Sequence, residues 1–553
     1  MRRKLVPLVA LGGLLALVIT WPAQGQAFSR SNALVILDAQ EPASPIPTLT
    51  RGGTANQQLS DLLFLRLAWL PPTLRTAGDQ GFVPQLARSW VRRDSVTLVF
   101  DLDPRARWHD GTPVTSRDVL FTFNHLRNPR VSPTLAALLR HIVDVRAEGN
   151  RRVVIRFDRP YSEQFFDATW YPQILPAHLL ANLDPDSIAT SPFARTPVGN
   201  GPYRWKRRVP GQLVEVEADP GFFLGRPGVE RVVWRVAPDP DALFALLLSG
   251  EADALDNGVA PLTNLRRAQR ERRLRLIPAP TLQLGYLLFN QRDPADTSRP
   301  HPILSDVDVR RALTLALDRT SIVRAVFGDY AAVPASAASQ MLWVRDPRLA
   351  PPPFDPEAAR RLLAAKGWVD RDGDGIREKD GRPLALTLNL PRPSAVRYQT
   401  ALLVQRQWRD IGADVTLAAL DGPTWVSRRN AGQFDIDFSS ATQDPTPAAL
   451  VQSWSCAGMR MSNVAKYCNP AVDSLIERGL LGKDPLPVWR QVLKTIADDQ
   501  PAVFMYAPTY VTAVDRRFTD ITIRPESWWA AVWTWRTVPA DSAAATRRQP
   551  AGR

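Results

Sequence analysis

Two short stretches of the chain alternate between apolar and polar side chains with a period of two. Residues 96–102 place valine, leucine or phenylalanine at every even position, and residues 153–157 place valine, isoleucine or phenylalanine at every odd position. Successive side chains of a strand point to opposite faces of a sheet, so this alternation is typical of a strand with one covered face. The pattern predicts two half-buried strands.

Apolar positions spaced by three or four residues predict helices elsewhere. Residues 115–127 open with Thr115 and Asp118 in the spacing of a capping box, and residues 239–250 carry a compact leucine face. Another helix has signals at both ends, because Asp355 can cap it, Pro356 fits its first position and Gly367 can end it. We therefore expect helices at these three places.

Strand and helix patterns then follow one another between residues 384 and 420. The segment LALTLNL at 384–390 and the segment 415–420 have strand patterns, and residues 395–411 between them have a helical pattern that stops at Gly412. Helix, strand, helix and strand in succession are typical of an α/β unit.

The turn at 367–384 resembles the start of a calcium-binding loop, with aspartates at 370, 372 and 374 followed by Gly375. Such a loop needs a bidentate glutamate at its twelfth position, which here is Gly381; Glu378 falls at the ninth. Aspartate and glycine also supply turn conformations without any metal. We expect a connecting turn with no metal requirement.

The size and charge of the chain narrow the class of protein. Its 553 residues are too many for one hydrophobic core, and we expect two to four compact units. The net charge of +14 raises nucleic acid as a partner, but the basic residues are scattered and only 7 of the 69 are lysine. A general preference for arginine explains the charge more simply, so we expect no nucleic-acid partner.

The first residues have the order of a secretory signal: a basic start, an apolar run at 5–19 and small residues before Gln26. We expect residues 1–25 to be a signal peptide and the mature protein to be periplasmic. No cysteine lies near the junction, which excludes a lipid anchor there; an uncleaved membrane anchor stays open. The small, polar residues 541–553 predict a disordered tail.

The chain has two cysteines, Cys456 and Cys468, which are 12 positions apart. In an oxidising compartment so close a pair usually forms a disulfide, whereas two buried free thiols are the alternative. No histidine lies near either cysteine, so a metal site there is not supported.

Motifs of catalysis are missing from the chain. It has no GxSxG elbow, HExxH zinc pair or GxxxxGKS/T phosphate loop, and its five histidines are dispersed. Aromatic residues are abundant instead, with 17 tryptophans, many of them beside loops, where rigid rings can line a binding pocket. We expect a binding protein without cofactors. A secreted glycan-active hydrolase and a non-transport envelope binding or chaperone protein remain alternatives, since an acid pair can lie far apart in sequence.

Several ordered motifs resemble one family. They are VPQLARSW at 83–90, VTLVFDLDPRARWHDGTPVTSRDVLFTFN at 96–124, TPVGNGPYRW at 196–205, GYLLFN at 285–290, DVRRALTLALDR at 308–319 and KYCNPAVDSLI at 466–476. Together they are similar to the family 5 extracellular solute-binding proteins, the capture subunits of ABC importers for peptides, dipeptides, nickel and related solutes. In this family a helix like that at 355–367 is commonly followed by a D-x-DGDG turn and a strand.

The resemblance implies an α/β, two-lobed fold of the periplasmic-binding-protein type, in its large three-domain variant with a hinge. It places lobe I at 28–72, 197–282 and 505–540, an inserted domain at 73–196 and lobe II at 283–504. Two chain crossings near 281–290 and 505–510 would form the hinge. Such a protein closes around its ligand, because the ligand touches both lobes only in the closed form.

The resemblance also suggests a site in SSATQDPTP at 439–447. Peptide-binding relatives often place an aspartate four residues before the proline of the DP element, to hold the free amino group of the ligand; that position is Ala441 here, whereas Asp444 is retained. We expect a polar solute, by default a short peptide, and a membrane permease as partner of a monomer. The candidate binding residues are Tyr286, Asn290, Trp425, Phe438, Asp444 and Trp454.

Overall fold

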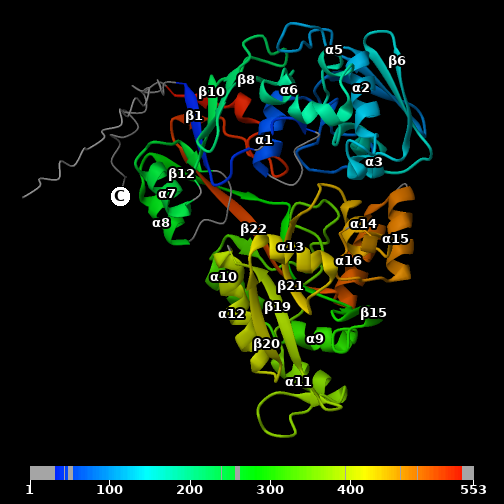
Figure 1. Ribbon diagram of the computed structural model, residues 1–553, viewed down its shortest axis with the longest axis vertical. Helices are drawn as coiled ribbons and strands as arrows, with labels where there is room; N and C mark the ends of the chain where they lie inside the picture. Colours follow the sequence, from blue (N-terminus) through cyan, green and yellow to red (C-terminus); the bar gives the residue numbers. More distant parts are fainter. Residues whose placement is uncertain are drawn as a thin grey trace, which may run out of the picture.

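The computed structural model describes residues 32–42, 44–47, 54–237, 239–255, 262–392, 394–460, 462–482 and 484–538. The predicted signal peptide at 1–25 and the predicted tail at 541–553 lie outside these ranges. Within them the chain forms two lobes, drawn one above the other in Figure 1. No helix of the described residues is long and apolar enough to cross a membrane.

Lobe I is built on a mixed sheet with the strand order β8-β9-β10-β1-β11-β22, and β12 pairs with β22 beside it. Its parallel centre is β1, which pairs with β10 and β11. The strands are β1 (Ala33–Asp38), β8 (Tyr203–Val209), β9 (Leu213–Ala218), β10 (Arg231–Val236), β11 (Ala254–Leu255), β12 (Leu274–Pro280) and β22 (Ala502–Asp515), with helices α1 (Thr54–Leu63), α7 (Pro240–Leu248) and α8 (Leu262–Arg270).

Lobe II continues the same sheet in the order β20-β19-β21-β13-β22. Its strands are β13 (Gln283–Phe289), β19 (Ala385–Pro391), β20 (Asp414–Leu420) and β21 (Ile436–Thr442). Its helices are α9 (Val307–Leu315), α10 (Arg319–Phe327), α11 (Pro356–Ala365), α12 (Ala395–Arg409), α13 (Gly422–Ala431), α14 (Ala449–Trp454), α15 (Pro470–Leu481) and α16 (Leu486–Asp499). Two separate clusters of buried apolar side chains pack on the two faces of this sheet.

The long strand β22 belongs to both lobes. Its first half pairs with β13, and its second half pairs with β12 from Thr509 onwards. The chain therefore passes between the lobes at 281–282 and at 507–508, and the Thr281 hydroxyl joins these two places by donating to the Pro508 carbonyl at 2.8 Å. Both places fall in the segments expected to form the hinge. The domain boundaries inferred from the resemblance stay a prediction.

Segment 73–196, which we call the inserted segment, carries an antiparallel sheet of its own in the order β4-β5-β7-β6. The strands are β4 (Ala87–Asp94), β5 (Thr97–Leu102), β6 (Ile142–Glu148) and β7 (Arg152–Phe157). Both predicted strands are present, but Val99 and Val154, expected on the open face, are 3% and 7% exposed. They are direct cross-strand partners and cover each other.

The helices of the inserted segment are α2 (Ser116–Leu126), α3 (Pro133–Leu138), α4 (Gln164–Thr169), α5 (Ala177–Leu180) and α6 (Pro192–Arg195). The predicted capping box is confirmed, because Thr115 caps α2 and Asp118 accepts a hydrogen bond from the Thr115 backbone N–H at 2.7 Å. In lobe II the predicted cap of α11 is also confirmed, since Asp355 accepts from the N–H of Ala358 at 2.8 Å.

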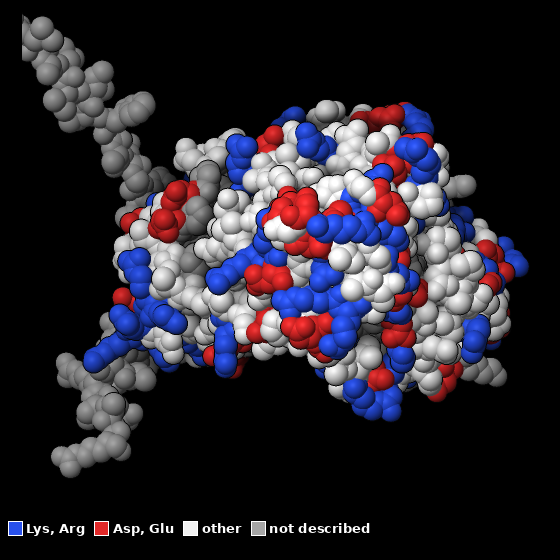
Figure 2. Space-filling model, turned by 90° about the horizontal axis from the view of Figure 1, so that it is seen from below, with Lys and Arg blue, Asp and Glu red and all other residues white. Residues whose placement is uncertain are grey.

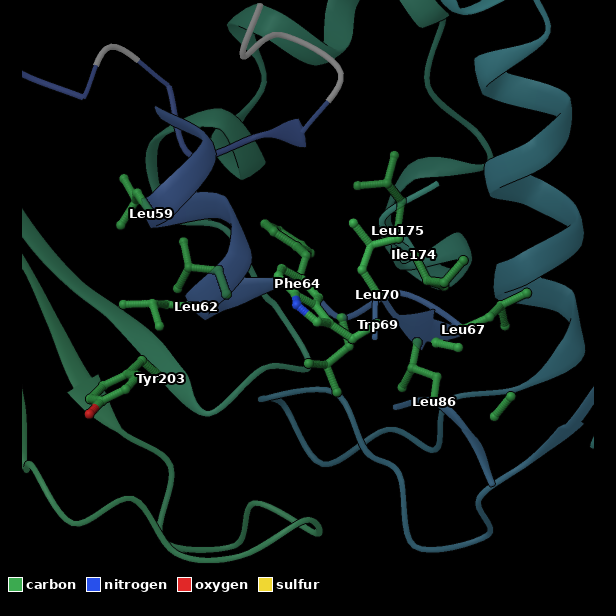
Figure 3. Close-up of a cluster of buried hydrophobic side chains, with 14 of the residues drawn as sticks. Leu59, Leu62, Phe64, Leu67, Trp69, Leu70, Leu86, Ile174, Leu175 and Tyr203 are labelled. Atoms are coloured by element: carbon green, nitrogen blue, oxygen red, sulfur yellow. The ribbon is translucent and has the colours of Figure 1, made fainter. Parts of the chain in front are cut away.

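The inserted segment and lobe I share one hydrophobic core. Figure 3 shows its centre, where Leu59 and Leu62 of α1 and Tyr203 of β8 lie in the same cluster as Leu86 and Ile174 of the inserted segment. All five side chains are fully buried. Because separating them would expose this apolar surface to water, we infer that the inserted segment and lobe I move as one body.

Candidate functional site

Three parallel strands of lobe II end on the side that faces lobe I. β19 runs parallel to β20 and β21, and β21 ends at Thr442, which pairs with Gln283 beside the crossing at 281–282. Helices α12 and α13 begin shortly after β19 and β20, and Figure 1 shows α13 at the end of lobe II near lobe I. Ligands of α/β sheets bind outside the carboxyl ends of the strands, so this edge is the candidate site.

A buried carboxylate lies near this edge: Asp437 of β21 pairs with Asn389, two residues before the end of β19. The indole Nε1 of Trp425 donates to Asp437 Oδ1 at 2.8 Å, and the Nε atom of Arg429 lies 3.4 Å from Oδ2. The hydroxyl of Ser439 donates to the same oxygen. Burial raises the pKa of Asp437, while the Ser439 hydrogen bond and the Arg429 charge act against that rise. The carboxylate thus fixes the Trp425 ring and the Arg429 guanidinium at the edge.

Arg397, in the first turn of α12, adds a second cation. Its guanidinium donates to the hydroxyl of Ser440 and lies 5.6 Å from the centre of the Trp425 ring, while that of Arg429 lies 5.8 Å away. No carboxylate of the described residues lies within ion-pair distance of Arg397, which is half-buried. Two guanidinium groups around one carboxylate leave an excess of positive charge, which can hold an anionic group of a solute.

Three of the predicted aromatic residues are buried in the lobe. Tyr286 and Trp454 belong to one cluster, with ring centres 5.9 Å apart, and Phe504 lies against both rings. Phe438 belongs to the cluster on the other face of the sheet, because it pairs with Leu287 rather than with Tyr286. The structure therefore brings Tyr286 and Trp454 together and places Phe438 apart from them. Their role in binding stays a prediction.

The amide of Asn290 is fully engaged in the fold. Its nitrogen donates to the carbonyls of Gly432 and Phe434, both at 2.9 Å, and its oxygen accepts from the N–H of Arg292 at 3.1 Å. The side chain is 0% exposed. In this conformation Asn290 holds the end of β13, and its predicted contact with a solute has no support from its position.

Asp444 lies where lobe II meets the inserted segment. The hydroxyl of Tyr171 donates to Asp444 Oδ2 at 3.4 Å, and two residues further on the hydroxyl of Thr446 donates to Glu163 Oε2 at 2.8 Å. Burial raises the pKa of Asp444, against the effect of the Tyr171 hydrogen bond. Ala441 packs against the aromatic cluster of lobe II, so no carboxylate occupies its place.

Further polar contacts lie between these two parts of the molecule. The N–H of Ser162 donates to the carbonyl of Leu480 at 2.8 Å, and the indole Nε1 of Trp343 donates to the hydroxyl of Thr76 at 3.2 Å. None of the ion pairs among the described residues joins the inserted segment to lobe II. The Arg75 guanidinium also lies 5.7 Å from the centre of the Trp343 ring, and Met341 of lobe II packs against the core of lobe I and the inserted segment. Among the described residues the two lobes therefore meet through single hydrogen bonds and isolated side-chain contacts.

Sequence reasoning missed Arg397, Arg429, Asp437, Glu163 and Tyr171. A signal for Arg397 existed, because PRPSAVR at 391–397 joins a strand end to a helix start, where ligands of α/β folds bind. The signal for Glu163 and Tyr171 was absent. They meet Asp444 and Thr446 across more than 270 positions of the chain.

The acidic turn after α11 lies at the far end of lobe II. Carboxylate oxygens of Asp370, Asp372 and Asp374 come within 4.8 Å of one another, and all three residues are exposed. Much of their hydrogen-bonding capacity serves the turn itself, since Asp370 accepts from the N–H groups of Gly373 and Gly375 at 2.8 and 3.0 Å. The prediction that this turn has no metal requirement remains to be tested.

The two cysteines are joined in the structure, with an S–S distance of 2.06 Å between Cys456 and Cys468. The bond closes the loop that follows α14. The backbone N–H of Cys456 also donates to Asp473 Oδ1 of α15 at 3.1 Å, so the loop is tied to the helix that faces the inserted segment.

Comparison with known proteins finds relatives along most of the chain. A model of the bacterial extracellular solute-binding proteins, family 5 Middle, matches residues 81–460. The oligopeptide-binding protein AppA of Bacillus subtilis is 27% identical over 454 residues, which cover 77% of this chain and 79% of AppA. The probable di/tripeptide-binding protein 5 of Pseudomonas aeruginosa is 26% identical over 444 residues, which cover 73% of this chain and 77% of that protein.

Solved structures share the fold. AppA from Bacillus subtilis in complex with a nonapeptide matches 92% of this chain and 99% of its own with a TM-score of 0.76 at 24% identity. NikZ from Campylobacter jejuni in complex with Ni(L-His) matches 92% of this chain and 100% of its own with a TM-score of 0.76 at 22% identity. The two-lobed fold and the match over residues 81–460 agree, and this chain belongs to the bacterial extracellular solute-binding proteins of family 5.

Proposed function

We propose that this chain is the substrate-binding subunit of an ABC importer. It captures a short peptide or peptide-like polar compound by closing its lobes, and it delivers this solute to a membrane permease. Similarity to proteins named for oligopeptide and di/tripeptide binding supports the peptide class. The family consists of solute-binding proteins, and we propose that this chain binds its solute without changing it chemically.

The observation that carries the proposal is the nature of the contact between the lobes. Lobe II touches the inserted segment through single hydrogen bonds such as Thr446 to Glu163, and two chain passages at 281–282 and 507–508 connect it to lobe I. Opening such a contact costs little free energy, because water can replace the few hydrogen bonds that are lost. Opening the core that lobe I shares with the inserted segment would cost much more, because it would expose apolar side chains to water. A ligand that contacts both sides then favours the closed form.

The charged edge of lobe II suggests how a peptide would be oriented. Arg397 and Arg429 offer guanidinium groups to a carboxylate, and the Trp425 ring between them offers an apolar wall. Asp444 stands four positions after Ser440, the partner of Arg397, so their α-carbons are at most about 14 Å apart along the chain. An extended peptide of three or four residues spans a similar distance. These groups would contact its two ends.

Isothermal titration calorimetry with a mixed library of di- to pentapeptides tests this function. Wild type is expected to bind, and Arg397→Ala is expected to weaken binding by roughly tenfold or more, because the carboxylate of the peptide loses a charged partner. Arg409→Ala, at the other end of α12, is the matched control and should bind like wild type. If Arg397→Ala binds peptides as tightly as wild type, the proposed orientation of the peptide is wrong. If wild type binds no peptide, the peptide class is refuted.

We further propose that the protein works as an exported, periplasmic monomer without a nucleic-acid partner. Figure 2 shows acidic and basic side chains side by side on the face of the molecule seen from below. Ion pairs of lobe II include that of Lys366 with Asp308 at 2.8 Å. The disulfide suits an oxidising compartment. Thiol labelling of unreduced protein from the periplasm should fail at both cysteines; ready labelling would contradict export in the oxidised form.

A further inference from the structure

A cavity of about 740 Å³ lies between the inserted segment and lobe II. The inserted segment contributes Tyr161, Glu163, Asp167 and Tyr171 to its wall, among others. Helices α14 and α15 of lobe II contribute polar side chains such as Gln452 and apolar ones such as Ile476 and Leu480. Pockets for small ligands usually have volumes of about 300 to 1,000 Å³, so this one can hold part of a peptide.

The wall from the inserted segment carries two acids, Glu163 and Asp167, and also the basic side chains Arg140, His141 and Arg159. Neither acid has an ion-pair partner among the described residues, although the Arg140 charge favours the ionised form of Asp167. Glu163 is 1% exposed; its Oε2 accepts from Thr446, while its Oε1 has no hydrogen-bond partner. Asp167 accepts from the Tyr161 hydroxyl at 2.6 Å, and Asp444, just behind the wall, accepts from the Tyr171 hydroxyl. All three acids are held by neutral hydroxyl groups.

Of these three acids Glu163 is the one that is fully buried, and elsewhere in the described residues the protein treats fully buried acids differently. Asp118 accepts backbone N–H groups of Thr115 and Ala177. The other buried acids each have an arginine within ion-pair distance, and these acids are Asp61, Asp103, Glu215, Asp219, Asp253 and Asp437. Burying a carboxylate without a positive partner is costly, so an acid such as Glu163 calls for a cation that is not part of the fold.

We propose that this cavity binds an ammonium group of the solute, with Glu163 as its direct partner and Asp167 and Asp444 completing an anionic wall. The inference rests on the proposed function, and it assigns the amino end of a bound peptide. The site also accounts for Ala441 at the position where peptide-binding relatives often have an aspartate, since here Glu163 of the inserted segment supplies the negative charge. A bound amine would then link the two lobes, because Glu163 and Asp444 lie on opposite sides of the contact.

The protonation of the wall gives the site a dependence on pH. Burial raises the pKa of Glu163 to about 7, against the hydroxyls of Thr76 and Thr446, and burial raises the pKa of Asp167 to about 8. The other ionisable groups that face this wall are Arg140, His141, Arg159, Tyr161, Tyr171, Asp444, Asp473 and Glu477. An ammonium group favours the ionised carboxylates, so binding of n-butylammonium, which stays charged, should strengthen as pH rises from 6 to 8. For a peptide the rise should level off near pH 8, because its α-amino group has a pKa of about 8 and loses its charge there.

Calorimetry with four probes tests the inference. The first is a di- to pentapeptide library without lysine or arginine, the second is the same library with acetylated amino ends, the third adds one lysine to each acetylated peptide, and the fourth is n-butylammonium. We expect wild type to bind the free-amine library at least tenfold more tightly than the acetylated one. Recovery of affinity in the third arm would show that a side-chain ammonium is accepted as well.

Glu163→Gln preserves the shape of the side chain and removes its charge. We expect this variant to bind free-amine peptides with an affinity within about threefold of that for acetylated ones. Its affinity should also change little between pH 6 and 8. Glu477→Gln, an exposed acid of the same cavity, is the control for general charge and should behave like wild type. Melting temperatures of both variants show whether they fold.

The outcomes separate the two proposals. Equal affinity of wild type for free-amine and acetylated libraries overturns the ammonium site and leaves the importer function in place. Equal weakening by Glu163→Gln and Glu477→Gln also overturns the site, because the effect would then be one of overall charge. Binding of n-butylammonium alone, abolished in Glu163→Gln, supports the site and refutes the peptide class. No binding in any arm overturns both.

Discussion

The inserted segment has two contact faces of opposite character. Towards lobe I it presents side chains such as Leu86 and Ile174, which are fully buried in a continuous apolar core (Figure 3). Towards lobe II it presents Ser162, Glu163 and Tyr171, which make single hydrogen bonds beside a large cavity. The first face is a permanent joint, and the second has the composition of a contact that forms and breaks.

The two faces also differ in how they treat charge. In the joint with lobe I, Asp61 is paired with Arg66 and accepts from the amide of Gln173 at 2.8 Å. At the contact with lobe II, Glu163 has no cation within ion-pair distance among the residues that the structure describes. A buried charge that is neutralised within the fold stabilises one arrangement, whereas an unpaired one makes the closed arrangement depend on a ligand. In the proposed site the ammonium group of the solute supplies the positive partner that Glu163 lacks, so the solute favours the closed form.

The largest effect is expected at Gly201, inside lobe I and next to the joint with the inserted segment. A Cβ atom there would lie 2.3 Å from the carbonyl oxygen of Leu62, at the end of α1, so the backbone would have to shift. Gly201→Ala should lower the free energy of unfolding by more than about 3 kcal/mol or prevent folding. Chemical denaturation followed by tryptophan fluorescence measures it.

Gly422→Ala is the matched control, because a Cβ atom there would meet nothing within 4 Å. Gly422 is the first residue of α13, where alanine is the better helix former, so a gain of up to about 1 kcal/mol is expected. Equal effects of the two substitutions would mean that the close approach at Gly201 does not matter.

His109 joins lobe I and the inserted segment as a neutral ring, since Nδ1 accepts from the Gly199 N–H at 3.1 Å and Nε2 lies 3.0 Å from the Gly201 carbonyl. Burial lowers the pKa of His109 from 6.5 to about 4. Between these values the unfolded chain binds a proton that the folded protein does not. The stabilisation is therefore complete above pH 6.5 and is lost as pH falls towards 4, by up to about 3 kcal/mol.

Unfolding measured at pH 7.5 and pH 4.5 checks this dependence. The difference between wild type and His109→Gln isolates the contribution of the histidine from that of the carboxylates, since only wild type can take up this proton. Wild type should lose stability on acidification relative to the variant. Parallel pH profiles of the two proteins would disprove the role of His109.

Replacing either of two threonines by valine is expected to have a smaller effect and compares the contact with lobe II directly with the packed interior. Thr446→Val removes the hydrogen bond to Glu163 across the contact between lobe II and the inserted segment. Thr122→Val removes a bond of 2.9 Å from the N–H of Leu175 within the inserted segment. We expect Thr122→Val to cost about 1 to 2 kcal/mol of unfolding free energy with no change in closure. Thr446→Val should leave that free energy nearly unchanged and lower the closed population about fivefold.

Small-angle scattering with and without a bound peptide reports closure, and thermal unfolding reports stability. If Thr446→Val lowers the free energy of unfolding as much as Thr122→Val does, the contact with lobe II is part of the permanent core, and the distinction between the two contact faces is wrong.

The smallest effect is expected at the acidic turn, far from both faces. Chelation by EDTA should shift the melting temperature by less than about 1 °C, because the position of the bidentate ligand is Gly381 and Asp370 is engaged with backbone N–H groups. Differential scanning fluorimetry with EDTA and with added calcium measures it. A shift of many degrees would show that this turn needs an ion.

Local structure followed from local sequence. The caps at Thr115 and Asp355 and the strands at 97–102 and 385–391 lie close to their predicted positions, because each depends on neighbours within a few residues. The face of β5 that was expected to be open to solvent is covered instead. Val99 and Val154, about 55 positions apart in the chain, lie side by side on this face and cover each other. A periodic pattern shows which side chains share a face and does not show what covers that face.

The sequence by itself determined the helices and strands, the disulfide partners and the family, all of which rest on local patterns or ordered motifs. Only the tertiary structure decided which groups meet. It separated Phe438 from Tyr286 by the pleat of one sheet, and it brought Glu163 to Thr446 across 283 positions. The physical reason is that register and lobe packing are set by the whole buried surface, so a contact between lobes leaves no signal in the residues beside it.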